Sequence, residues 1–345
     1  MPVTIKHVAA EAGVSASTVS RVLTGDRRIS EPTRQRVLAI MEQMGYHPNA
    51  IARSLVNQKS NTIGLVLSRT PRAAMAIPFF AELIGGITEQ AYADKHHVLL
   101  VSSMSREEEC NQVLDLFRNR RVEGVIHAAS HMNDPLVNAL EQEGFPFVVI
   151  GRVPGSNVPS VNNDNIAAAD MAVTHLLDQG YARIACVGGS PDLVVTFDRL
   201  QGYKNALERR GIEVRKGWVI CSESTTLAGM AAGEKLLEPG RAAGERPDAI
   251  FAMDDTLAVG VLKSARQYGI RCPEELGLIG FNDDMISSIM EPALSTVRIP
   301  IFEMGRQAAK MLIRGIEQEF TGKNRIVPAE LVVRQSSMRQ QGFSN

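Results

Sequence analysis

The stretch TIKHVAAEAGVSASTVSRVL, residues 4–23, decides how the N-terminal part of this 345-residue chain folds. Apolar residues recur at the spacing of one helix face over 5–12, which predicts a helix with Thr4 as its N-cap. A glycine ends this helix, and Ser15 stands where it would cap a second helix over 16–23. Two short helices joined by a tight turn that contains glycine form a helix-turn-helix. A third helix, with Ser30 as its cap and Pro32 in its first turn, completes a compact unit.

The second helix leaves a polar face on its outside. Its apolar residues turn inward, and the residues left for solvent are Ala16, Ser17, Thr18, Ser20 and Arg21. Small polar donors with one arginine suit close approach to phosphates and base edges. Residues 1–60 hold eight Lys/Arg and four Asp/Glu, a net charge of +4, whereas the rest of the chain has a net charge of −5. A basic end on an acidic body is typical of a module that binds nucleic acid, and a basic surface that is merely solvated is the alternative.

The segment HPNAIARSLVN, residues 47–57, allows two interpretations. It is either a linker docked on the body or a hinge helix, capped by Asn49, that becomes ordered on DNA. So short a helix is marginal in isolation and needs external packing. In the second interpretation its apolar side chains act as wedges in the minor groove.

From residue 61 onward, strand-like and helix-like segments alternate. The predicted strands are 62–67, 97–102, 124–128, 147–150, 183–187, 218–221, 249–252 and 278–280. Helical stretches such as 166–179, 196–209 and 255–268 lie between them. Apolar strands alternating with helices predict an α/β fold with two doubly wound, mostly parallel sheets and a cleft between them.

The remaining composition narrows the class of protein. No run of about 18 apolar residues is present, so nothing is expected to span a membrane. No apolar export signal precedes the first helix, and the four cysteines form no C-x-x-C pair. We therefore expect a cytoplasmic protein with no contact to a membrane.

Motifs of the common enzyme classes are absent from the sequence. It holds no G-x-S-x-G, H-E-x-x-H or phosphate-binding G-x-x-x-x-G-K motif. His127 and His131 have the spacing of helical metal ligands, but a strand and a loop are predicted there, which favours ordinary polar histidines. We expect neither catalysis, nor a metal, nor a cofactor.

Polar side chains instead gather at the expected cleft. Ligands of such sheets bind at the carboxyl ends of the strands. The loops expected there are 67–80, 102–106, 188–199, 222–226, 253–255 and 281–284. They contain Arg199 together with several Asn and Asp residues, a set that suits a ligand rich in hydroxyl groups. A surface salt bridge for Arg199 and helix capping for Asp255 are the alternative roles.

Two segments carry a resemblance: residues 4–23 and ISEPTRQRVLAIMEQMGYHPNAIARSL, residues 29–55. Together they closely resemble the lactose-repressor/purine-repressor (LacI/GalR) family, and the resemblance covers essentially the whole chain. It implies a helix-turn-helix domain at 1–48, a hinge helix and linker at 49–60, and an effector-binding and dimerisation domain at 61–345. That last domain would resemble periplasmic binding proteins, with subdomains at about 61–160 plus 294–323 and about 161–293 plus 324–345.

The resemblance also assigns DNA contacts. Ala16, Ser17 and Arg21 match residues that read bases in the major groove, although Ala16 offers only an apolar contact. The residues that match phosphate contacts are Thr4, Ser15, Thr18, Ser20, Ser30 and Thr33. Leu55 matches the leucine that inserts between the central base pairs of the operator.

For the cleft, the resemblance implies a small-molecule effector. Arg199 and Asn282 match the residues that clamp it, and Phe79, Asn163, Ser224 and Asp254 match others that line the pocket. Ser224 stands where purine-binding members place a stacking aromatic, which argues against a nucleobase. The motifs VNNDN (161–165), FDRLQGY (197–203) and GFNDD (280–284) look most like the maltose-operon branch.

The sequence thus predicts a dimeric transcription repressor of sugar-utilisation genes. Each subunit would present one recognition helix to a half-site of a palindromic operator, and a sugar, most simply maltose or another α-glucoside, would act through the cleft. A global catabolite regulator that binds the phosphorylated histidine phosphocarrier protein is the main alternative. A solute-binding protein and an enzyme of sugar metabolism are weaker ones, opposed by the basic N-terminal module and the missing catalytic motifs.

Overall fold

The computed structural model divides the chain into two compact units, Met1–Asn61 and Thr62–Asn345. It describes residues 3–23, 26–46, 59–68, 70–128, 131–240, 244–318, 320 and 324–339. The predicted hinge, 49–57, and Leu55 within it therefore lie outside the described residues. Among the helices that are described, none combines the length and the apolar character needed to cross a lipid bilayer.

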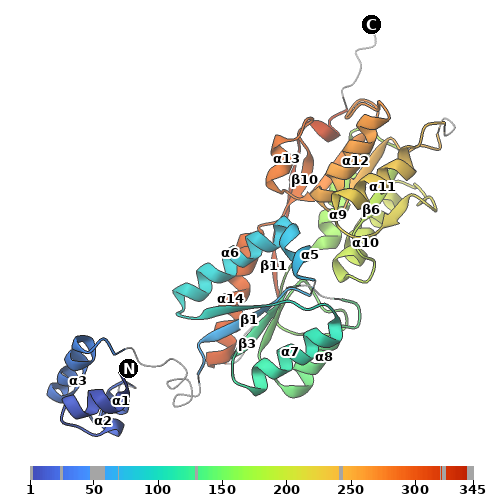
Figure 1. Ribbon diagram of the computed structural model, residues 1–345. Coiled ribbons are helices and arrows are strands. Elements are labelled where there is room, and N and C mark those ends of the chain that lie inside the picture. Colours follow the sequence, from blue (N-terminus) through green and yellow to red (C-terminus); the bar gives the residue numbers. More distant parts are fainter. Residues whose placement is uncertain are drawn as a thin grey trace. The chain divides into compact units, whose positions relative to one another are not determined.

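The small unit is a three-helix bundle. Its helices are α1 (Ile5–Glu11), α2 (Ala16–Leu23) and α3 (Glu31–Gln43) (Figure 1). Val8, Val19, Val22 and Val37 are buried between them, so each helix contributes to one core. The Ser15 hydroxyl accepts a hydrogen bond from the Thr18 amide at 3.1 Å, which caps α2 as predicted.

The large unit has two lobes, each built on a six-stranded sheet (Figure 1). The first sheet has the order β11-β5-β4-β3-β1-β2, with all neighbours parallel. Its strands are β1 (Thr62–Val66), β2 (His97–Val101), β3 (Gly124–His127), β4 (Phe147–Ile150), β5 (Ser160–Asn163) and β11 (Asn324–Val327). The four-residue strand β4 is buried along its whole length, as expected of a parallel strand covered on both faces.

The second sheet has the order β12-β10-β9-β8-β6-β7. Its strands are β6 (Ile184–Gly188), β7 (Val219–Cys221), β8 (Ala249–Ala252), β9 (Gly277–Asn282), β10 (Ser295–Arg298) and β12 (Glu330–Val332). Neighbours are parallel except β12, which runs antiparallel to β10. Every residue of β9 is buried, which makes it a central strand of this lobe.

Helices cover both faces of each sheet. Around the first sheet lie α5 (Pro71–Ala76), α6 (Pro78–Ala93), α7 (Arg106–Arg118), α8 (Pro135–Glu143) and α14 (Ile301–Gln318); around the second lie α9 (Asn165–Asp178), α10 (Val194–Arg209), α11 (Thr226–Leu237), α12 (Asp255–Gln267) and α13 (Met285–Ile289). A single-turn 3-10 helix, Gln335–Ser337, follows β12. In each lobe two helix pairs sandwich the sheet, which is the doubly wound arrangement.

Glycine allows two of these helix pairs to pack closely. A Cβ at Gly86 of α6 would lie 1.9 Å from the Phe302 carbonyl oxygen on α14. A Cβ at Gly260 of α12 would lie 2.2 Å from the Thr226 carbonyl oxygen on α11. No side chain fits at either distance, so both positions require glycine.

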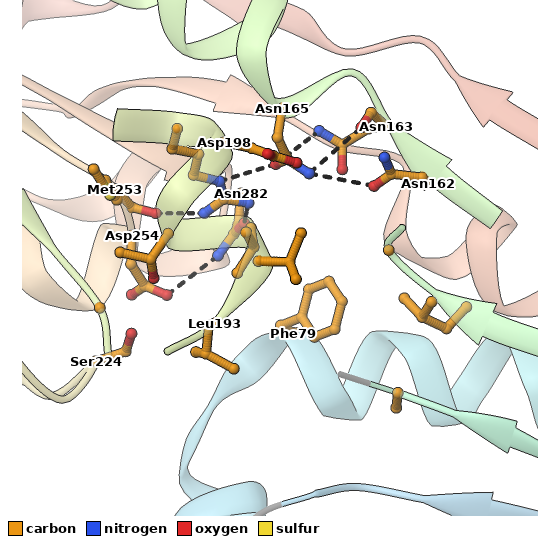
Figure 2. A pocket seen from close by; sticks show the side chains of 18 of the residues that line it. Phe79, Asn162, Asn163, Asn165, Leu193, Asp198, Ser224, Met253, Asp254 and Asn282 are labelled. Atoms are coloured by element: carbon orange, nitrogen blue, oxygen red, sulfur yellow. Dashed lines mark hydrogen bonds between the residues drawn. The ribbon is translucent and has the colours of Figure 1, made fainter. Parts of the chain in front are cut away.

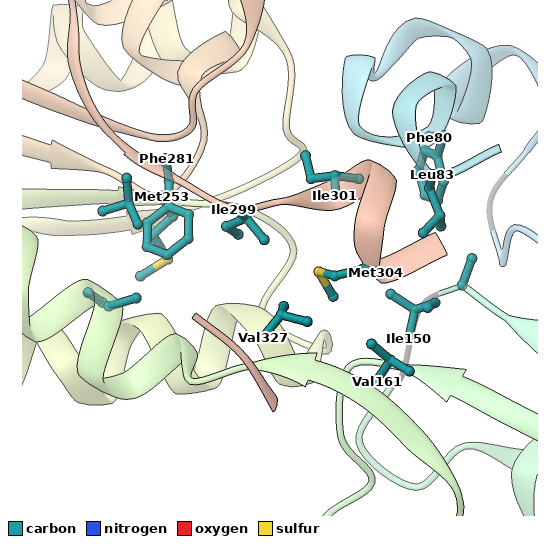
Figure 3. Close-up of a cluster of buried hydrophobic side chains, with 14 of the residues drawn as sticks. Phe80, Leu83, Ile150, Val161, Met253, Phe281, Ile299, Ile301, Met304 and Val327 are labelled. Atoms are coloured by element: carbon teal, nitrogen blue, oxygen red, sulfur yellow. The ribbon is translucent and has the colours of Figure 1, made fainter. Parts of the chain in front are cut away.

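One buried cluster joins the two lobes where the chain crosses between them. It includes Phe80 and Ile150 of the first lobe and Met253 and Phe281 of the second. Figure 3 shows Ile299 and Met304, just after β10 and within α14, placed between these two groups. Both lobes therefore share one apolar base beneath the cleft.

The fold class is the one predicted, and all eight predicted strands are present. Four further strands, β5, β10, β11 and β12, were not predicted. They are short and carry polar residues, because each lies at a crossover or a sheet edge. As a result β5 and β11 fall in the first lobe and β10 in the second, so the expected subdomain boundaries each shift by one strand.

Candidate functional site

The predicted DNA-contacting side chains share the polar surface of the small unit. Ser15, Ser17 and Arg21 are exposed at α2, while Ala16, Thr18 and Ser20 are partly exposed. Thr4 and Ser30 are exposed at the beginnings of α1 and α3, and Thr33 is partly exposed within α3. None of the described members of this set belongs to the buried core, so their polar groups are available at the surface.

Hydroxyl groups at the beginning of α2 form one small network. The Ser15 hydroxyl lies 2.7 Å from that of Ser17 and 2.9 Å from that of Thr18. The Ser30 hydroxyl lies 2.9 Å from that of Thr33 at the beginning of α3. These contacts hold hydroxyls beside helix N-termini, where backbone amides and the helix dipole favour a phosphate.

A second candidate site is the pocket between the two lobes of the large unit. It encloses about 910 Å³, including the part that is open to solvent. All six side chains predicted to bind an effector line it: Phe79, Asn163, Arg199, Ser224, Asp254 and Asn282. They come from α6 and β5 of the first lobe and from α10, β9 and the loops after β7 and β8 of the second. The six residues predicted from the sequence are far apart in the chain, and the fold brings them to one pocket.

Arg199 is the centre of the pocket's hydrogen-bond network. Its Nε donates to Asn165 Oδ1 at 3.0 Å, and its Nη2 donates to Asn282 Oδ1 at 3.5 Å. Its Nη1 donates to the Met253 carbonyl oxygen. A guanidinium has five N–H groups, so two of them have no hydrogen-bond partner within the described part of the chain. The alternative role of Arg199, a surface salt bridge, is excluded because Arg199 is buried.

The guanidinium of Arg199 also stacks on an aromatic ring, that of Phe281. Its carbon atom lies 3.6 Å from the ring centroid of Phe281, which is fully buried. Stacking on an aromatic face fixes the plane of the guanidinium and therefore the direction of its N–H groups. Burial lowers the pKa of Arg199 to about 10, opposed by the carboxylates of Asp254 and Asp255, so it stays charged at neutral pH.

Amide and carboxylate groups on either side of Arg199 complete the polar wall. Asn163 Nδ2 donates to Asn165 Oδ1 at 3.1 Å, and Asn165 Nδ2 lies 3.3 Å from Asn162 Oδ1 (Figure 2). On the opposite side, Asn282 Nδ2 donates to Asp254 Oδ2 at 3.4 Å. The other Asp254 oxygen caps α12 by accepting from the Thr256 amide at 2.8 Å. The pocket thus offers donors and acceptors side by side.

Phe79 supplies an apolar face to the same pocket. Figure 2 shows its ring projecting from the beginning of α6 toward the polar groups of the second lobe. The ring packs edge-on against Phe80, with their centroids 5.4 Å apart. Leu193 and Val194 extend this apolar wall from the second lobe.

The backbone is strained where β9 meets the pocket. Asn282 has a φ of 108° and Asp283 a φ of 60°, both in the region that favours glycine. Such strain persists only where surrounding contacts fix it. Here Asp283 pairs with Arg298 at 2.8 Å and Arg334 at 2.7 Å, and these ion pairs hold the turn that presents Asn282.

Two buried carboxyl groups stand behind the pocket. Asp255 accepts from Thr296 Oγ1 at 2.6 Å and from the Asp284 amide at 2.8 Å, so its role is to join β9, β10 and α12 rather than to cap a helix. Burial raises the pKa of Asp255 to about 7 despite these hydrogen bonds. Burial and the charges of Asp255 and Asp254 raise the pKa of Asp284 to about 7 as well.

Sequence reasoning missed an ion pair that crosses the cleft. Arg152, just after β4, pairs with Asp198 of α10, with its Nε 2.8 Å from Asp198 Oδ2. Both residues line the pocket, and Asp198 is buried. The signal was available, because the loop after strand 147–150 lies at the same sheet edge as the loops that were predicted.

Ser68, His127 and Asp134 have the residue types of a hydrolase catalytic triad, but their hydrogen bonds differ from those of a triad. Ser68 Oγ lies 3.2 Å from His127 Nδ1, and His127 Nε2 lies 2.8 Å from Asp134 Oδ2. However, the Ser68 hydroxyl donates its hydrogen bond to Glu109 at 3.0 Å. A nucleophile must donate to its base. The arrangement therefore anchors the ends of β1 and β3 to α7 and α8.

Family models match both parts of the chain. Residues 4–49 match the model described as bacterial regulatory proteins, lacI family. Residues 173–337 match the model of the periplasmic binding protein-like domain. The two matches fall on the three-helix unit with its following segment and on the second lobe with the return through α14.

Similar curated proteins extend over nearly the whole chain. Catabolite control protein A of Priestia megaterium is 33% identical over 340 residues, covering 98% of this chain and 100% of that protein. The HTH-type transcriptional regulator CelR of Thermobifida fusca is 34% identical over 337 residues, covering 96% of this chain and 98% of that protein.

Solved structures agree with these relatives. A complex of the transcriptional regulator CelR with cellobiose has a TM-score of 0.75 and 31% identity, covering 97% of this chain and 99% of that chain. The lac repressor dimer bound to operator and the anti-inducer ONPF has a TM-score of 0.86 and covers 98% of this chain and 100% of that chain. At 24% identity, the second likeness shows the fold.

Proposed function

Because this chain belongs to the lacI family of bacterial regulatory proteins, we propose that it represses sugar-utilisation genes and responds to a neutral sugar, maltose or another α-glucoside. The observation that carries the sugar assignment is the ring of donors and acceptors around Arg199, faced by Phe79. Sugar hydroxyls both donate and accept, and a sugar ring has apolar faces that cover an aromatic.

The proposed DNA surface is the exposed face of α2. Ser17 and Arg21 would contact base edges, and Ala16 would offer a methyl contact. The phosphate contacts would come from Thr4, Ser15, Thr18, Ser20, Ser30 and Thr33. The proposal includes Leu55 as a minor-groove wedge within a hinge at 49–60, between a DNA-binding domain at 1–48 and an effector domain at 61–345.

Three features favour a neutral sugar over a flat base. Ser224 provides a hydroxyl rather than an aromatic ring, so a base has no second ring on which to stack. A base would also leave buried Asn and Asp groups without partners, which is costly. In addition, the related CelR was solved in complex with cellobiose, a neutral disaccharide.

A symmetric dimer fits both a palindromic operator and an exposed apolar surface on the second lobe. Operators of such regulators are palindromic because two identical subunits read two half-sites. The short helix α13 exposes large apolar side chains on the second lobe, with Met285 83% exposed and Ile289 69% exposed. Apolar side chains exposed together mark surfaces that are covered by a partner, and we assign this surface to the second subunit.

The catabolite-regulator alternative has one observation in its favour. The 33% identical relative from Priestia megaterium is named catabolite control protein A. In that case a phosphorylated histidine phosphocarrier protein would replace the free sugar as the co-regulator. The cleft would then bind no sugar tightly, which separates the two proposals.

Calorimetry of the purified chain tests the sugar assignment. We expect heat of binding with maltose, and none with guanine or hypoxanthine, and we include trehalose, sucrose, cellobiose and glucose to define the class. Tight binding of a purine without binding of any sugar would overturn the assignment. If none of these compounds binds and the phosphorylated histidine phosphocarrier protein does, the chain is a catabolite regulator.

A further inference from the structure

A second hollow adjoins the interlobe pocket, and the proposed disaccharide site does not use it. This outer groove encloses about 990 Å³, including the part open to solvent, and it shares two lining residues, Ile77 and Ser224, with the inner pocket. The two spaces therefore meet at a common wall. Because the two spaces adjoin, the outer groove is the neighbouring volume that a ligand longer than the inner pocket would enter.

Both lobes contribute to the outer groove. The first lobe supplies Ser68 after β1 and Ser103 after β2, together with Ala76 at the end of α5. The second lobe supplies Ser190 after β6 and Glu223 after β7. The groove therefore lies at the carboxyl ends of the strands in both sheets, where ligands of doubly wound folds bind.

The chemistry of the groove suits hydroxyl groups. Apolar side chains form part of its lining, and the polar part consists of seven residues with hydroxyls and two with carboxylates, besides Arg106: Ser68, Thr70, Ser103, Ser105, Ser190, Ser224, Thr225, Glu109 and Glu223. Several are fixed in place, since Ser103 Oγ donates to Gln112 at 2.9 Å and Ser68 Oγ donates to Glu109 at 3.0 Å. A set that is rich in acceptors and held rigidly matches a polyhydroxylated ligand.

The same lining argues against an anionic ligand. Its arginine, Arg106, is already paired with Asp192 across the cleft and lies 2.8 Å from His131 Nδ1. Glu109 and Glu223 would repel a phosphate or carboxylate placed between them. A neutral ligand avoids this repulsion.

We propose that the outer groove is an additional sugar subsite, so that the full effector is a linear glucoside of three or more units. This inference rests on the proposed sugar-binding function of the inner pocket. The inner pocket would hold the first two units, and the outer groove would hold the next one through its hydroxyl and carboxylate groups. Chain length would then be read by the groove, and sugar identity by Arg199 and its neighbours.

The test is calorimetry with matched sugars of two and three units. The probes are maltose with maltotriose and cellobiose with cellotriose, each titrated into the wild-type chain. In the series whose disaccharide binds, we expect the trisaccharide to bind about tenfold more tightly, a gain of about 1.4 kcal/mol. Equal affinities would overturn the subsite and leave the proposed function standing, whereas no binding by any of these four sugars or by trehalose, sucrose or glucose would overturn both.

Two variants locate the gain in the groove. Ala76→Trp places a bulky ring in the outer groove but not in the inner pocket, because Ala76 lines only the former. We expect it to remove the advantage of the trisaccharide and to leave disaccharide affinity unchanged. Ala93→Trp, at an exposed position at the end of α6, is the matched control and should keep the advantage.

Glu223→Ala keeps the proposal testable if the tryptophan variant does not fold. Glu223 is exposed and lines only the outer groove, so its loss should not disturb folding. We expect it to weaken trisaccharide binding several-fold and to leave the disaccharide unaffected. Unchanged trisaccharide binding in both Ala76→Trp and Glu223→Ala would contradict the subsite.

Discussion

The polar face of the small unit and the polar cleft of the large unit place their functional groups in opposite surroundings. On α2, Ser17 and Arg21 are exposed and lie outside the bundle core. In the cleft, Arg199 and Asn282 are buried and share hydrogen bonds with each other and with the backbone. Functional groups at the surface can change without disturbing the fold, whereas buried ones serve folding and binding together.

This difference predicts which substitutions separate function from stability. Surface substitutions away from caps and buried networks change stability by about 0.5 kcal/mol or less. Removing one member of a buried charged network costs about 3–5 kcal/mol, because its partners remain buried without compensation. The small unit should therefore show losses of affinity alone, and the cleft should show both losses.

The largest effect is expected for Arg199→Ala. It removes the partner of Asn165 and of the Met253 carbonyl, and it takes away the positive charge that interacts with four nearby carboxyl groups. We expect sugar affinity to fall by about a hundredfold or more, with a clearly lower Tm for the large unit. Operator binding should persist at temperatures where the variant is folded, and calorimetry and thermal unfolding measure the two effects.

Arg209→Ala is the matched control on the same helix. Arg209 pairs with Asp170 at the surface of α10, and its side chain is 55% exposed. Exposed pairs contribute at most about 1 kcal/mol, so this variant should keep both stability and sugar binding. Equal losses in the two variants would show that α10 as a whole, and not the Arg199 network, determines binding.

A smaller effect is expected for Arg21→Ala. Loss of a base contact should weaken operator binding by about 1–3 kcal/mol per subunit and relax sequence preference. The Tm should not change, because the side chain is exposed on α2. Fluorescence anisotropy at fixed salt, with operator and with scrambled DNA, provides the measurement.

Arg28→Ala controls for charge alone. Arg28 belongs to the same unit but follows α2 and pairs with Asp26 at 2.7 Å. Its loss should affect operator and scrambled DNA by similar factors. If Arg21→Ala and Arg28→Ala change the preference for operator over scrambled DNA by the same factor, Arg21 has no role in reading bases.

Ser15→Ala is the substitution in the small unit that should lower stability, as substitutions in the cleft do. The Ser15 hydroxyl caps α2, so its removal should lower the free energy of unfolding of the small unit by about 1 kcal/mol. Ser20→Ala, further along α2, removes a hydroxyl that takes no part in the cap and should leave stability unchanged. Circular dichroism on thermal unfolding compares them, and equal Tm values would mean that the cap does not stabilise α2.

The smallest effect concerns the pH dependence of stability. The pKa of Asp255 is raised to about 7 in the folded chain, so between about pH 4 and pH 7 the folded state binds more protons than the unfolded state. Its contribution to stability is therefore complete at low pH and is lost as the pH rises toward 7. Burial lowers the pKa of His131 and His175, whose contributions have the opposite sign.

Asp255→Asn isolates the carboxyl contribution. Because the variant has no proton to lose at this position, the difference in Tm between it and the wild type should change by a few degrees between about pH 5.5 and about pH 7.5. The variant should gain stability relative to the wild type as the pH rises. A difference that stays constant over this interval would mean that Asp255 does not titrate there.

Much of the fold and of both sites follows from local sequence patterns. The turn glycine, the cap at Ser15 and the apolar runs of the central strands determine local structure by short-range chemistry, and all were predictable. The strands β5, β10, β11 and β12 were not, because polar residues such as Asn162 and Arg298 break their apolar pattern. They pair only because the crossovers bring them beside formed strands.

The same distinction holds inside the cleft. Side chains that follow an apolar strand, such as Asp254 and Asn282, could be placed at the cleft edge from strand order alone. The pairing of Arg152 with Asp198 joins two lobes, and the stacking of Arg199 on Phe281 depends on the packing of α10 against β9. These contacts are set by tertiary geometry, which short-range patterns do not encode.

The most direct test of the account is whether the cleft and the recognition helix are coupled. Operator affinity is measured by anisotropy at fixed salt with and without saturating maltose, and maltose affinity is measured by calorimetry with and without operator. If maltose is the inducer, it lowers operator affinity, and by linkage operator lowers maltose affinity by the same factor. Maltose that binds in the cleft and leaves operator affinity unchanged would contradict the account.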